Sequence, residues 1–238
     1  MPVISFLLPA RHRVDDVRRI CKYLLPQIIR AECELIFVEE RAFSNSELST
    51  LLRSRGARCA MVDSSRMEFH KTLLLNHALG HARGDFVIPL DVDLIPLFSI
   101  STLCSLLIAS PQLIIGGYRI MSGHDPLEMN ICTIAVPKPA PEDCSGAVYK
   151  QLMHGERFMV CPAYKRLELL SIGGWDERFV GWGCEDQDVL ERYCNSTMHI
   201  CARSRDLLYL HFDHSDQPGW NDPELVNANR EHYYSMNR

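Results

Sequence analysis

The sequence predicts a single α/β domain with a central, mostly parallel sheet. Apolar, strand-like runs alternate with helical patterns over residues 1–96, in the order strand, helix, strand, strand, helix, strand. Acidic residues stand where two of these runs end, and the carboxyl ends of parallel strands form the edge at which ligands bind. The 238 residues contain no repeat, low-complexity tract or linker, so we assign residues 1–238 to one domain.

Composition narrows the class of protein. Hydrophobic residues make up 47% of the chain, which is typical of a folded globular protein, and the net charge of −5 argues against general binding to nucleic acid. The apolar runs are too short to span a bilayer and no signal sequence is evident, so we expect a cytoplasmic protein without a transmembrane segment. Ten cysteines without a CxxC pair predict reduced thiols.

The first elements follow from simple patterns. Residues 3–8 form an apolar strand that Pro9 ends. A helix follows, because apolar side chains recur at a period near 3.6 over residues 14–25. The second strand, residues 34–38, ends in Glu39 and a second glutamate.

The same patterns predict the remaining elements. Helices are expected at residues 47–53, 67–82, 99–109, 167–172, 185–194 and 223–234, and strands at residues 59–62, 85–90 and 112–120, with an extended stretch reaching Phe212. Ser64 or Ser65 is a candidate N-cap for the helix at 67–82, and Pro89 predicts a bulge or an early end to pairing in its strand. Residues 121–153, which are rich in proline, predict a long loop that acts as a lid.

The most informative stretch is GDFVIPLDVDLIP, residues 84–96. It places Asp91 and Asp93 at the carboxyl end of a buried strand. If the strand continues, the two acids point to one side and Val92 to the other. Two carboxylates on one side would suit a divalent cation. Two turn-forming acids that merely close the strand are the alternative explanation.

A second stretch, GGWDERFVGWGCEDQD at residues 173–188, combines glycines, acids and two tryptophans. Glycines allow a close approach of backbone to ligand, and an indole such as that of Trp182 can stack on a sugar, so we interpret the tryptophans as binding residues rather than core. Glu185 and Asp186 begin a predicted helix, where one carboxylate can accept a proton while the other holds a hydroxyl. A glycine-rich turn with an acidic helix start is the alternative.

A third stretch, LHFDHSD at residues 210–216, contains His211 and His214. Both can face a metal ion if the chain turns like a helix, whereas in a straight strand they face opposite sides. A site made of Asp93 and imidazoles suits Mn²⁺, whereas Mg²⁺ favours a site of oxygen ligands alone. Two histidines of the surface or the core are the alternative explanation.

Four blocks of the sequence together resemble the GT-A glycosyltransferases, specifically those similar to animal β-1,4-galactosyltransferases and bacterial chondroitin-polymerase-type enzymes. In the order of the chain, which is also the family order, the blocks are LLPARHR, FHKTLLLNHALGHA, DVDLIP and GGWDERFVGWGCED. The blocks lie within residues 7–221. The resemblance implies the Rossmann-like GT-A fold, with a nucleotide-sugar-binding half at residues 1–96 and an acceptor-binding, metal-completing half at residues 97–238.

The resemblance also implies roles for individual residues. Donor-side candidates are Pro9, Arg11, Arg13, Glu39, Phe69, Lys71, Asp91 and Val92. Trp182 matches the acceptor-site tryptophan, Glu185 the acid that holds the acceptor, and Asp186 the catalytic base. Asp93 and His214 match metal ligands, and His211 falls where the galactosyltransferases use a sulfur ligand. Cys184 replaces a glycine of the family pattern.

The function implied is the inverting transfer of Gal, GalNAc, GlcNAc or Glc from a UDP-sugar to a hydroxyl of a glycan, peptide or small molecule, with Mn²⁺ or Mg²⁺. The ion neutralises the leaving diphosphate, helped by Arg11 or Arg13, and Asp186 takes the acceptor proton. A retaining N-acetylgalactosaminyltransferase-like enzyme is an alternative, although that type usually has Glu-Asn where this chain has Glu185-Asp186. A noncatalytic carbohydrate-binding subunit and a nucleotidyltransferase are further alternatives.

Overall fold

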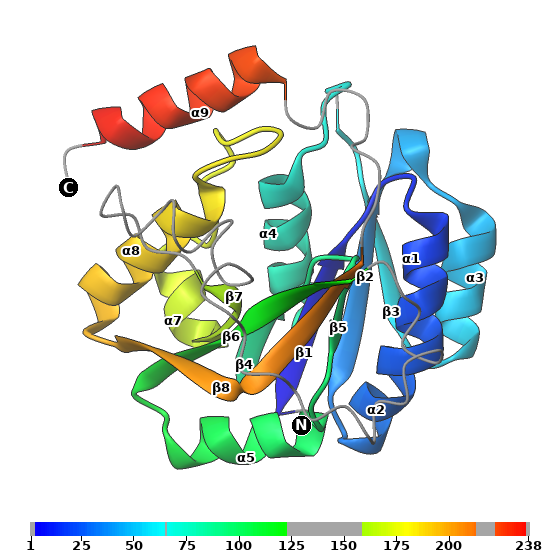
Figure 1. Cartoon of the computed structure of the whole chain (residues 1–238). Helices are drawn as coiled ribbons and strands as arrows, with labels where there is room; N and C mark the ends of the chain where they lie inside the picture. Colours follow the sequence, from blue (N-terminus) through cyan, green and yellow to red (C-terminus); the bar gives the residue numbers. More distant parts are fainter. Residues whose placement is uncertain (1–2, 65, 123–158, 213–221, 237–238) are drawn as a thin grey trace.

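A sheet of eight strands lies at the centre of the described residues, with helices on both faces (Figure 1). The computed structural model describes residues 3–64, 66–122, 159–212 and 222–236. The strands are β1 (Ile4–Pro9), β2 (Glu34–Glu40), β3 (Arg58–Val62), β4 (Phe86–Pro89), β5 (Leu94–Pro96), β6 (Leu113–Ser122), β7 (Val160–Lys165) and β8 (Ile200–Phe212). Their order in the sheet is β3-β2-β1-β4-β7-β6-β8-β5.

The first half of the sheet is entirely parallel and the second half is mixed. β3, β2, β1 and β4 pair in parallel. β7 is antiparallel to both β4 and β6, β8 runs parallel to β6, and β5 is antiparallel to β8. The predicted fold class, an α/β domain with a mostly parallel sheet, is confirmed.

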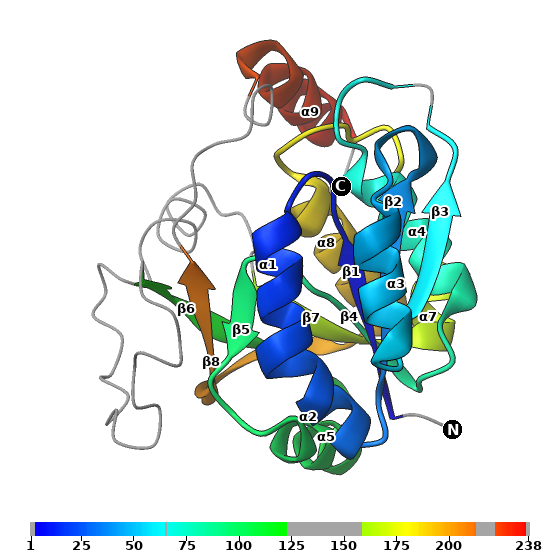
Figure 2. The ribbon, with the colours of Figure 1, turned by 90° about the vertical axis from the view of Figure 1, so that its right-hand side faces the viewer.

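Helices cover both faces of this sheet. They are α1 (Val14–Arg19), the π-helical turn η1 (Ile20–Leu24), α2 (Leu25–Arg30), the 3₁₀ turn η2 (Arg41–Phe43), α3 (Ser46–Ser54), α4 (Lys71–His81), α5 (Ile100–Ala109), α7 (Arg166–Ser171), α8 (Glu185–Thr197) and α9 (Pro223–Ser235). α1, α2 and α3 lie on one face, and α4, α7 and α8 on the other (Figures 1 and 2). None of the helices in the described ranges is long and apolar enough to cross a membrane.

Alternating strand residues build two separate cores. Phe6 and Leu8 of β1 pack with Val17 of α1, whereas Leu7 between them packs with Leu74 of α4. This alternation follows from the two-residue period of a strand, and each helix contributes its apolar stripe. Both faces of β1 are therefore buried, which explains its unbroken apolar sequence.

The predicted helix at 14–25 is present but contains the π-helical turn η1. Pro26 in the first turn of α2 has no N–H to donate to the preceding turn, and its ring needs space there. Apart from the helix at 67–82, the other predicted elements begin and end within three residues of the observed ones. β5 and β7 are short strands that the sequence pattern does not predict, and the predicted lid at 121–153 lies outside the described residues after the end of β6.

The helix predicted at 67–82 begins only at Lys71, so the serine N-cap is wrong. His70 occupies the N-cap position, and its Nε2 hydrogen-bonds the carbonyl of Glu177 at 2.8 Å. The hydroxyl of Ser64 instead accepts a hydrogen bond from the N–H of Arg66 at 3.3 Å, and Ser65 lies outside the described residues. The segment before α4 therefore serves long-range contacts, which outweigh the local helical pattern.

Candidate active site

A pocket of about 880 Å³ opens at the carboxyl ends of β1 and β4, between the start of α4 and the start of α8. Most predicted site residues line it: Pro9, Arg11, Arg13, Phe69, Lys71, Asp91, Val92, Asp93, Trp182, Glu185, Asp186 and His211. Residues far apart in the sequence thus meet at the sheet edge where an α/β fold binds its ligands. His214 lies outside the described residues.

The acidic pair lies in a turn and not in a continuing strand. β4 ends at Pro89, which has no N–H for a ladder hydrogen bond. The N–H of Leu94 donates to the carbonyl of Asp91 at 3.1 Å and closes the turn. All three residues of the turn line the pocket, and Val92 is also buried in the core, so it anchors the turn.

Strand pairing brings Asp93 beside His211. Leu94 of β5 is the partner of His211 in β8, and the N–H of Phe212 donates to the carbonyl of Asp93 at 3.0 Å. The Nε2 atom of His211 lies 3.7 Å from Oδ1 of Asp93. The guanidinium of Arg13 approaches the other carboxylate oxygen of Asp93 at 3.3 Å, so a cation from the β1–α1 connection faces this pair.

The carboxylate of Asp93 and the imidazole of His211 fit a divalent transition ion. Both belong to the ligand types that Mn²⁺ accepts, and both line one pocket. Within the described ranges no group of three or more His, Cys, Asp or Glu residues is arranged so that it could hold a metal ion. His214, the further ligand predicted from the sequence, is not among the described residues.

A partly buried lysine joins the two acidic motifs. The Nζ atom of Lys71, in the first turn of α4, lies 3.2 Å from Asp91, 3.2 Å from Glu185 and 3.1 Å from Asp186. Burial alone would lower the pKa of this ammonium, but the three carboxylates raise its pKa well above the usual range. Lys71 therefore remains charged and holds both motifs together.

The three carboxylates around Lys71 do not titrate alike. Burial, together with the charges of Glu185 and Asp91, raises the pKa of Asp186 to about 7, although Lys71 opposes this shift. Burial also acts to raise the pKa of Asp91, but the attraction of Lys71 wins and lowers its pKa. One acid of the cluster is thus close to the pKa that suits a general base at neutral pH.

The start of α8 fixes the orientation of this acid pair. Cys184, at the N-cap, has a positive φ of 68°, a backbone conformation that favours glycine. This is the position where the family pattern has glycine. The N–H of Gly183 donates to the carboxylate of Glu185 at 3.0 Å. Glu185 is consequently held against the chain, while Asp186 is the more exposed of the two acids.

Arg11 is held in the wall of the pocket. It forms a salt bridge to Glu40 and donates to the carbonyls of Met67 and Glu68. Its guanidinium carbon also lies 3.9 Å from the ring centre of Phe43. The sequence does not predict Phe43, which reaches the pocket only because Arg11 and η2 meet there.

Glu39 lies outside the 880 Å³ pocket. Its carboxylate accepts hydrogen bonds from the N–H of Asn45 (3.1 Å) and the hydroxyl of Ser49 (3.0 Å) at the start of α3. Burial raises the pKa of Glu39. Glu39 therefore supports the start of α3 and lines a small neighbouring cavity together with Arg13, outside the main pocket.

Two comparisons with known proteins bear on this site. A family model described as the N-terminal domain of galactosyltransferase matches residues 159–215, which include Trp182, Glu185, Asp186 and His211. A search of the curated proteins finds no match. Among solved structures, the Pyrobaculum calidifontis mannosyltransferase PcManGT in complex with GDP-Man and Mn²⁺ is similar at a TM-score of 0.58 and 17% identity, covering 92% of this chain and 59% of that one.

The catalytic domain of Drosophila β1,4-galactosyltransferase 7, in complex with xylobiose, has a TM-score of 0.55 and 17% identity over 94% of this chain and 79% of its own. Staphylococcus aureus TarS in complex with UDP has a TM-score of 0.57 and 15% identity over 90% and 61%. The chain has the GT-A glycosyltransferase fold. Over residues 159–215 the chain is similar to the galactosyltransferase family, and these neighbours with the same fold are glycosyltransferases. The chain spans less than two thirds of the mannosyltransferase and of TarS.

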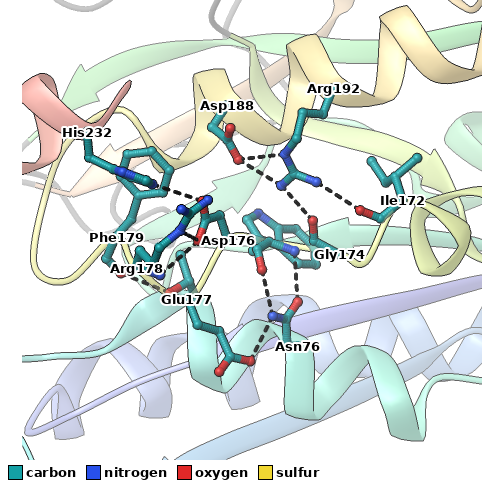
Figure 3. A network of polar contacts seen from close by, with 12 residues as sticks. Asn76, Ile172, Gly174, Asp176, Glu177, Arg178, Phe179, Asp188, Arg192 and His232 are labelled. Atoms are coloured by element: carbon teal, nitrogen blue, oxygen red, sulfur yellow. Dashed lines mark hydrogen bonds and ion pairs between the residues drawn. The ribbon is translucent and has the colours of Figure 1, made fainter. Parts of the chain in front are cut away.

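In this GT-A fold the loop at residues 173–184, termed the 173–184 loop, carries the matched glycines and Trp182. The side-chain amide of Asn76, in α4, makes two hydrogen bonds to the backbone of Trp175 (Figure 3). It donates to the Trp175 carbonyl and accepts from the Trp175 N–H, both at 2.8 Å. Arg192 of α8 donates to the carbonyl of Gly174 at 2.7 Å and to the carboxylate of Asp188 (Figure 3). Side chains of two helices therefore fix the first half of the loop.

The two tryptophans of the 173–184 loop have different surroundings. Trp175 is buried and packs against Tyr164 in the core, so the interpretation of both tryptophans as binding residues is wrong for Trp175. Trp182 is 46% exposed and lines the pocket. The N–H of Gly181 donates to the carbonyl of Phe69 at 3.0 Å, which places the Trp182 segment beside the start of α4.

The sequence also misses part of the pocket lining of this glycosyltransferase fold. Arg119 of β6 and four residues at or in α9 line the pocket: Asp222, Glu224, Leu225 and Ala228. α9 lies above α8 and the 173–184 loop in Figures 1 and 2. Nothing in a short polar helix at the end of a sequence signals such a position, since only the tertiary fold brings it over the pocket.

Proposed function

We propose that this chain is a metal-dependent, inverting glycosyltransferase that moves a hexose from a UDP-sugar to an acceptor hydroxyl, with Asp186 as the general base. The hexose would be Gal, GalNAc, GlcNAc or Glc. One observation carries the proposal: the single ammonium of Lys71 lies within 3.2 Å of both Asp91 in the turn after β4 and Asp186 at the start of α8. Donor-side and acceptor-side acids thus share one pocket.

The donor diphosphate is assigned to the side of the pocket lined by Arg13, Asp93 and His211. Asp93 and His211 would hold the divalent ion, with His214 as a further ligand. When bound, such an ion supplies Lewis-acid stabilisation of the negative charge that develops on the leaving diphosphate. Arg13, 3.3 Å from Asp93, adds a fixed positive charge on the same side.

The acceptor is assigned to the side lined by Trp182, Glu185 and Asp186. The exposed indole of Trp182 offers a flat apolar surface for a sugar ring. Glu185 would accept a hydrogen bond from an acceptor hydroxyl, and its contacts with Gly183 and Lys71 keep it in place. Asp186, with a pKa of about 7, is present partly as carboxylate at neutral pH and can take a proton.

The reaction then balances as a single displacement. The acceptor hydroxyl loses its proton to Asp186, and its oxygen forms a bond to the anomeric carbon of the donor sugar. The bond from that carbon to the diphosphate oxygen breaks, and the electron pair leaves with UDP. Because attack and departure take place on opposite faces, an α-linked donor gives a β-glycoside.

Nucleotide release from a panel of nucleotide sugars tests this function directly. Purified protein is incubated with UDP-Gal, UDP-GalNAc, UDP-GlcNAc, UDP-Glc and GDP-Man, each with Mn²⁺, Mg²⁺ or EDTA. We expect release of UDP from at least one UDP-hexose with a divalent ion, and none with EDTA. Asp186→Asn should bind that donor normally but fail to transfer the sugar. A protein that releases nucleotide from none of the donors would contradict the proposal, and equal transfer by Asp186→Asn would remove this residue as the base.

A further inference from the structure

Asn229 of α9 is buried and hydrogen-bonds the backbone beside Trp182. Its side-chain amide donates to the carbonyl of Val180 at 2.8 Å and to the carbonyl of Trp182 at 3.1 Å. Its carbonyl oxygen accepts from the N–H of Val180 at 3.3 Å. One side chain thus satisfies three backbone groups, much as a neighbouring strand would.

The segment between these contacts is held on its other side by the body of the protein. The N–H of Gly181 donates to the carbonyl of Phe69 at 3.0 Å, and Phe69 also lines the pocket. Val180 and Trp182 are therefore bound by α9, and Gly181 between them is bound by the segment before α4. This alternation fixes the direction in which the indole of Trp182 enters the pocket.

α9 has further contacts that do not involve residues 180–182. Nε2 of His232 lies 3.0 Å from the carboxylate of Asp176 (Figure 3), and the hydroxyl of Tyr233 donates to Glu191 of α8 at 2.9 Å. Asn229, His232 and Tyr233 thus attach the helix at three places. Among these three contacts, only that of Asn229 reaches the backbone of Trp182. The Tyr233 contact offers a matched control for loosening of α9 as a whole.

Asn229 also stands next to the part of α9 that lines the pocket. Ala228 precedes it and Leu225 lies one turn earlier, and both side chains line the pocket together with Trp182. An acceptor that stacks on the indole would therefore meet α9 as well. Asn229 sets the spacing between these two walls, because it hydrogen-bonds one wall while belonging to the helix that forms the other.

We infer that Asn229 is a positioning residue for the acceptor: it holds Trp182 against α9 and so fixes the site in which the acceptor sugar stacks. The inference rests on the proposed function, since it names the side of the pocket that the acceptor occupies. Asn229 itself does not line the pocket. Its loss should therefore weaken acceptor binding and leave the donor side unchanged.

Three variants separate this role from general folding. Asn229→Ala removes all three hydrogen bonds, and Asn229→Asp keeps the size and the acceptor for Val180 but loses the N–H donors to the two carbonyls. Tyr233→Phe removes a different α9 contact. For both Asn229 variants we expect the acceptor KM to rise about tenfold, with the donor KM for hydrolysis changed by less than about twofold. Tyr233→Phe should leave both values near those of the wild type.

Results of another kind would overturn the inference. These are an unchanged acceptor KM in Asn229→Ala, equal losses on the donor and acceptor sides, or the same loss in Tyr233→Phe. If both Asn229 variants fail to fold, as judged by circular dichroism, the residue has a folding role and the positioning role is rejected.

A second readout does not depend on activity. In a Trp220→Phe background, the remaining tryptophans are the buried Trp175 and the exposed Trp182. Acrylamide quenching then reports mainly on Trp182, and we expect Asn229→Ala to change it while Tyr233→Phe does not. If no donor is used, the proposed function fails, but this measurement still decides whether Asn229 fixes Trp182. Identical quenching in all variants would contradict that role.

Discussion

The Nζ atom of Lys71 lies 3.1 Å from Oδ2 of Asp186. The same ammonium also contacts Asp91 and Glu185, so three carboxylates share one positive charge. Burial, together with the negative charges of Glu185 and Asp91, explains why the pKa of Asp186 is raised to about 7 even with a lysine beside it. Lys71 therefore limits how far this pKa rises and keeps Asp186 usable as a base near neutral pH.

Replacing Lys71 should move the pH dependence of transfer. Because Lys71 lowers the pKa of Asp186, its removal in Lys71→Met raises that pKa, and the carboxylate form appears only at higher pH. We expect the acidic limb of the kcat/KM profile to shift upward by about one pH unit or more. Lys71→Arg keeps the charge and should retain the wild-type limb. An unshifted limb in Lys71→Met would show that Lys71 does not set this titration.

Asp186 should cost the folded protein stability above acidic pH. Its folded pKa of about 7 lies above the usual value of an unfolded aspartate, so the folded state binds this proton more tightly. That advantage is complete below the unfolded pKa and is lost as the pH rises through 7. The Asp186→Asn variant has no titrating group here and does not lose this stability. The free energy of unfolding of the variant minus that of the wild type should therefore increase between pH 4 and pH 8, as measured in urea denaturation series. A constant difference across this range would contradict the raised pKa.

Asp93 and His211 should control the metal requirement. Each variant, Asp93→Asn or His211→Ala, removes one predicted ligand. We expect the Mn²⁺ concentration for half-maximal nucleotide release to rise about tenfold or more. His199→Ala, at an imidazole that does not line the pocket, is the control. An unchanged Mn²⁺ response in both ligand variants would place the ion elsewhere.

Two glycines provide a paired test of the 173–184 loop. Gly174 has φ of +67°, and a Cβ there would overlap the amide oxygen of Asn76. Gly174→Ala should therefore destabilise the protein by about 2 kcal/mol or more. Gly80, in α4, has open space around it, and Gly80→Ala should stabilise by up to about 1 kcal/mol. Chemical denaturation measures both, and equal effects of the two substitutions would contradict the geometry.

The sequence predicts those parts of the fold that depend on local periodicity. The strand at β1 and the helices α3, α5 and α8 follow from apolar spacing, and the acids after β4 mark the sheet edge. The family resemblance then selects twelve residues that line the pocket, together with Glu39, which lies outside it. These signals succeed because the side chains of each element alternate or recur with a fixed period.

Other features depend on contacts between distant segments. Glu39 and Glu40 are neighbours on β2 and point to opposite sides, so one binds the start of α3 and the other Arg11. Similarly, Trp175 and Trp182 stand in one glycine-rich loop, but only the second is exposed. The sequence gives no periodic pattern in these places that would separate core from pocket.

The asparagines illustrate the same limit. Asn76 and Asn229 belong to helices whose local pattern assigns them no role, yet each hydrogen-bonds the backbone of the 173–184 loop. A side chain that binds the backbone of another segment is visible only once the tertiary structure places the two together. Sequence patterns therefore predict the acids of the candidate site better than the residues that hold its loops.

Inverting transfer with Asp186 as base is the central claim, and the anomeric configuration of the product tests it most directly. The glycoside formed from the α-linked UDP-hexose that the chain uses is analysed by proton NMR, in which the coupling of the anomeric proton of the transferred sugar is read. The account predicts a β-glycoside, whose formation stops in Asp186→Asn. An α-glycoside would contradict it and would favour a retaining enzyme of the N-acetylgalactosaminyltransferase type.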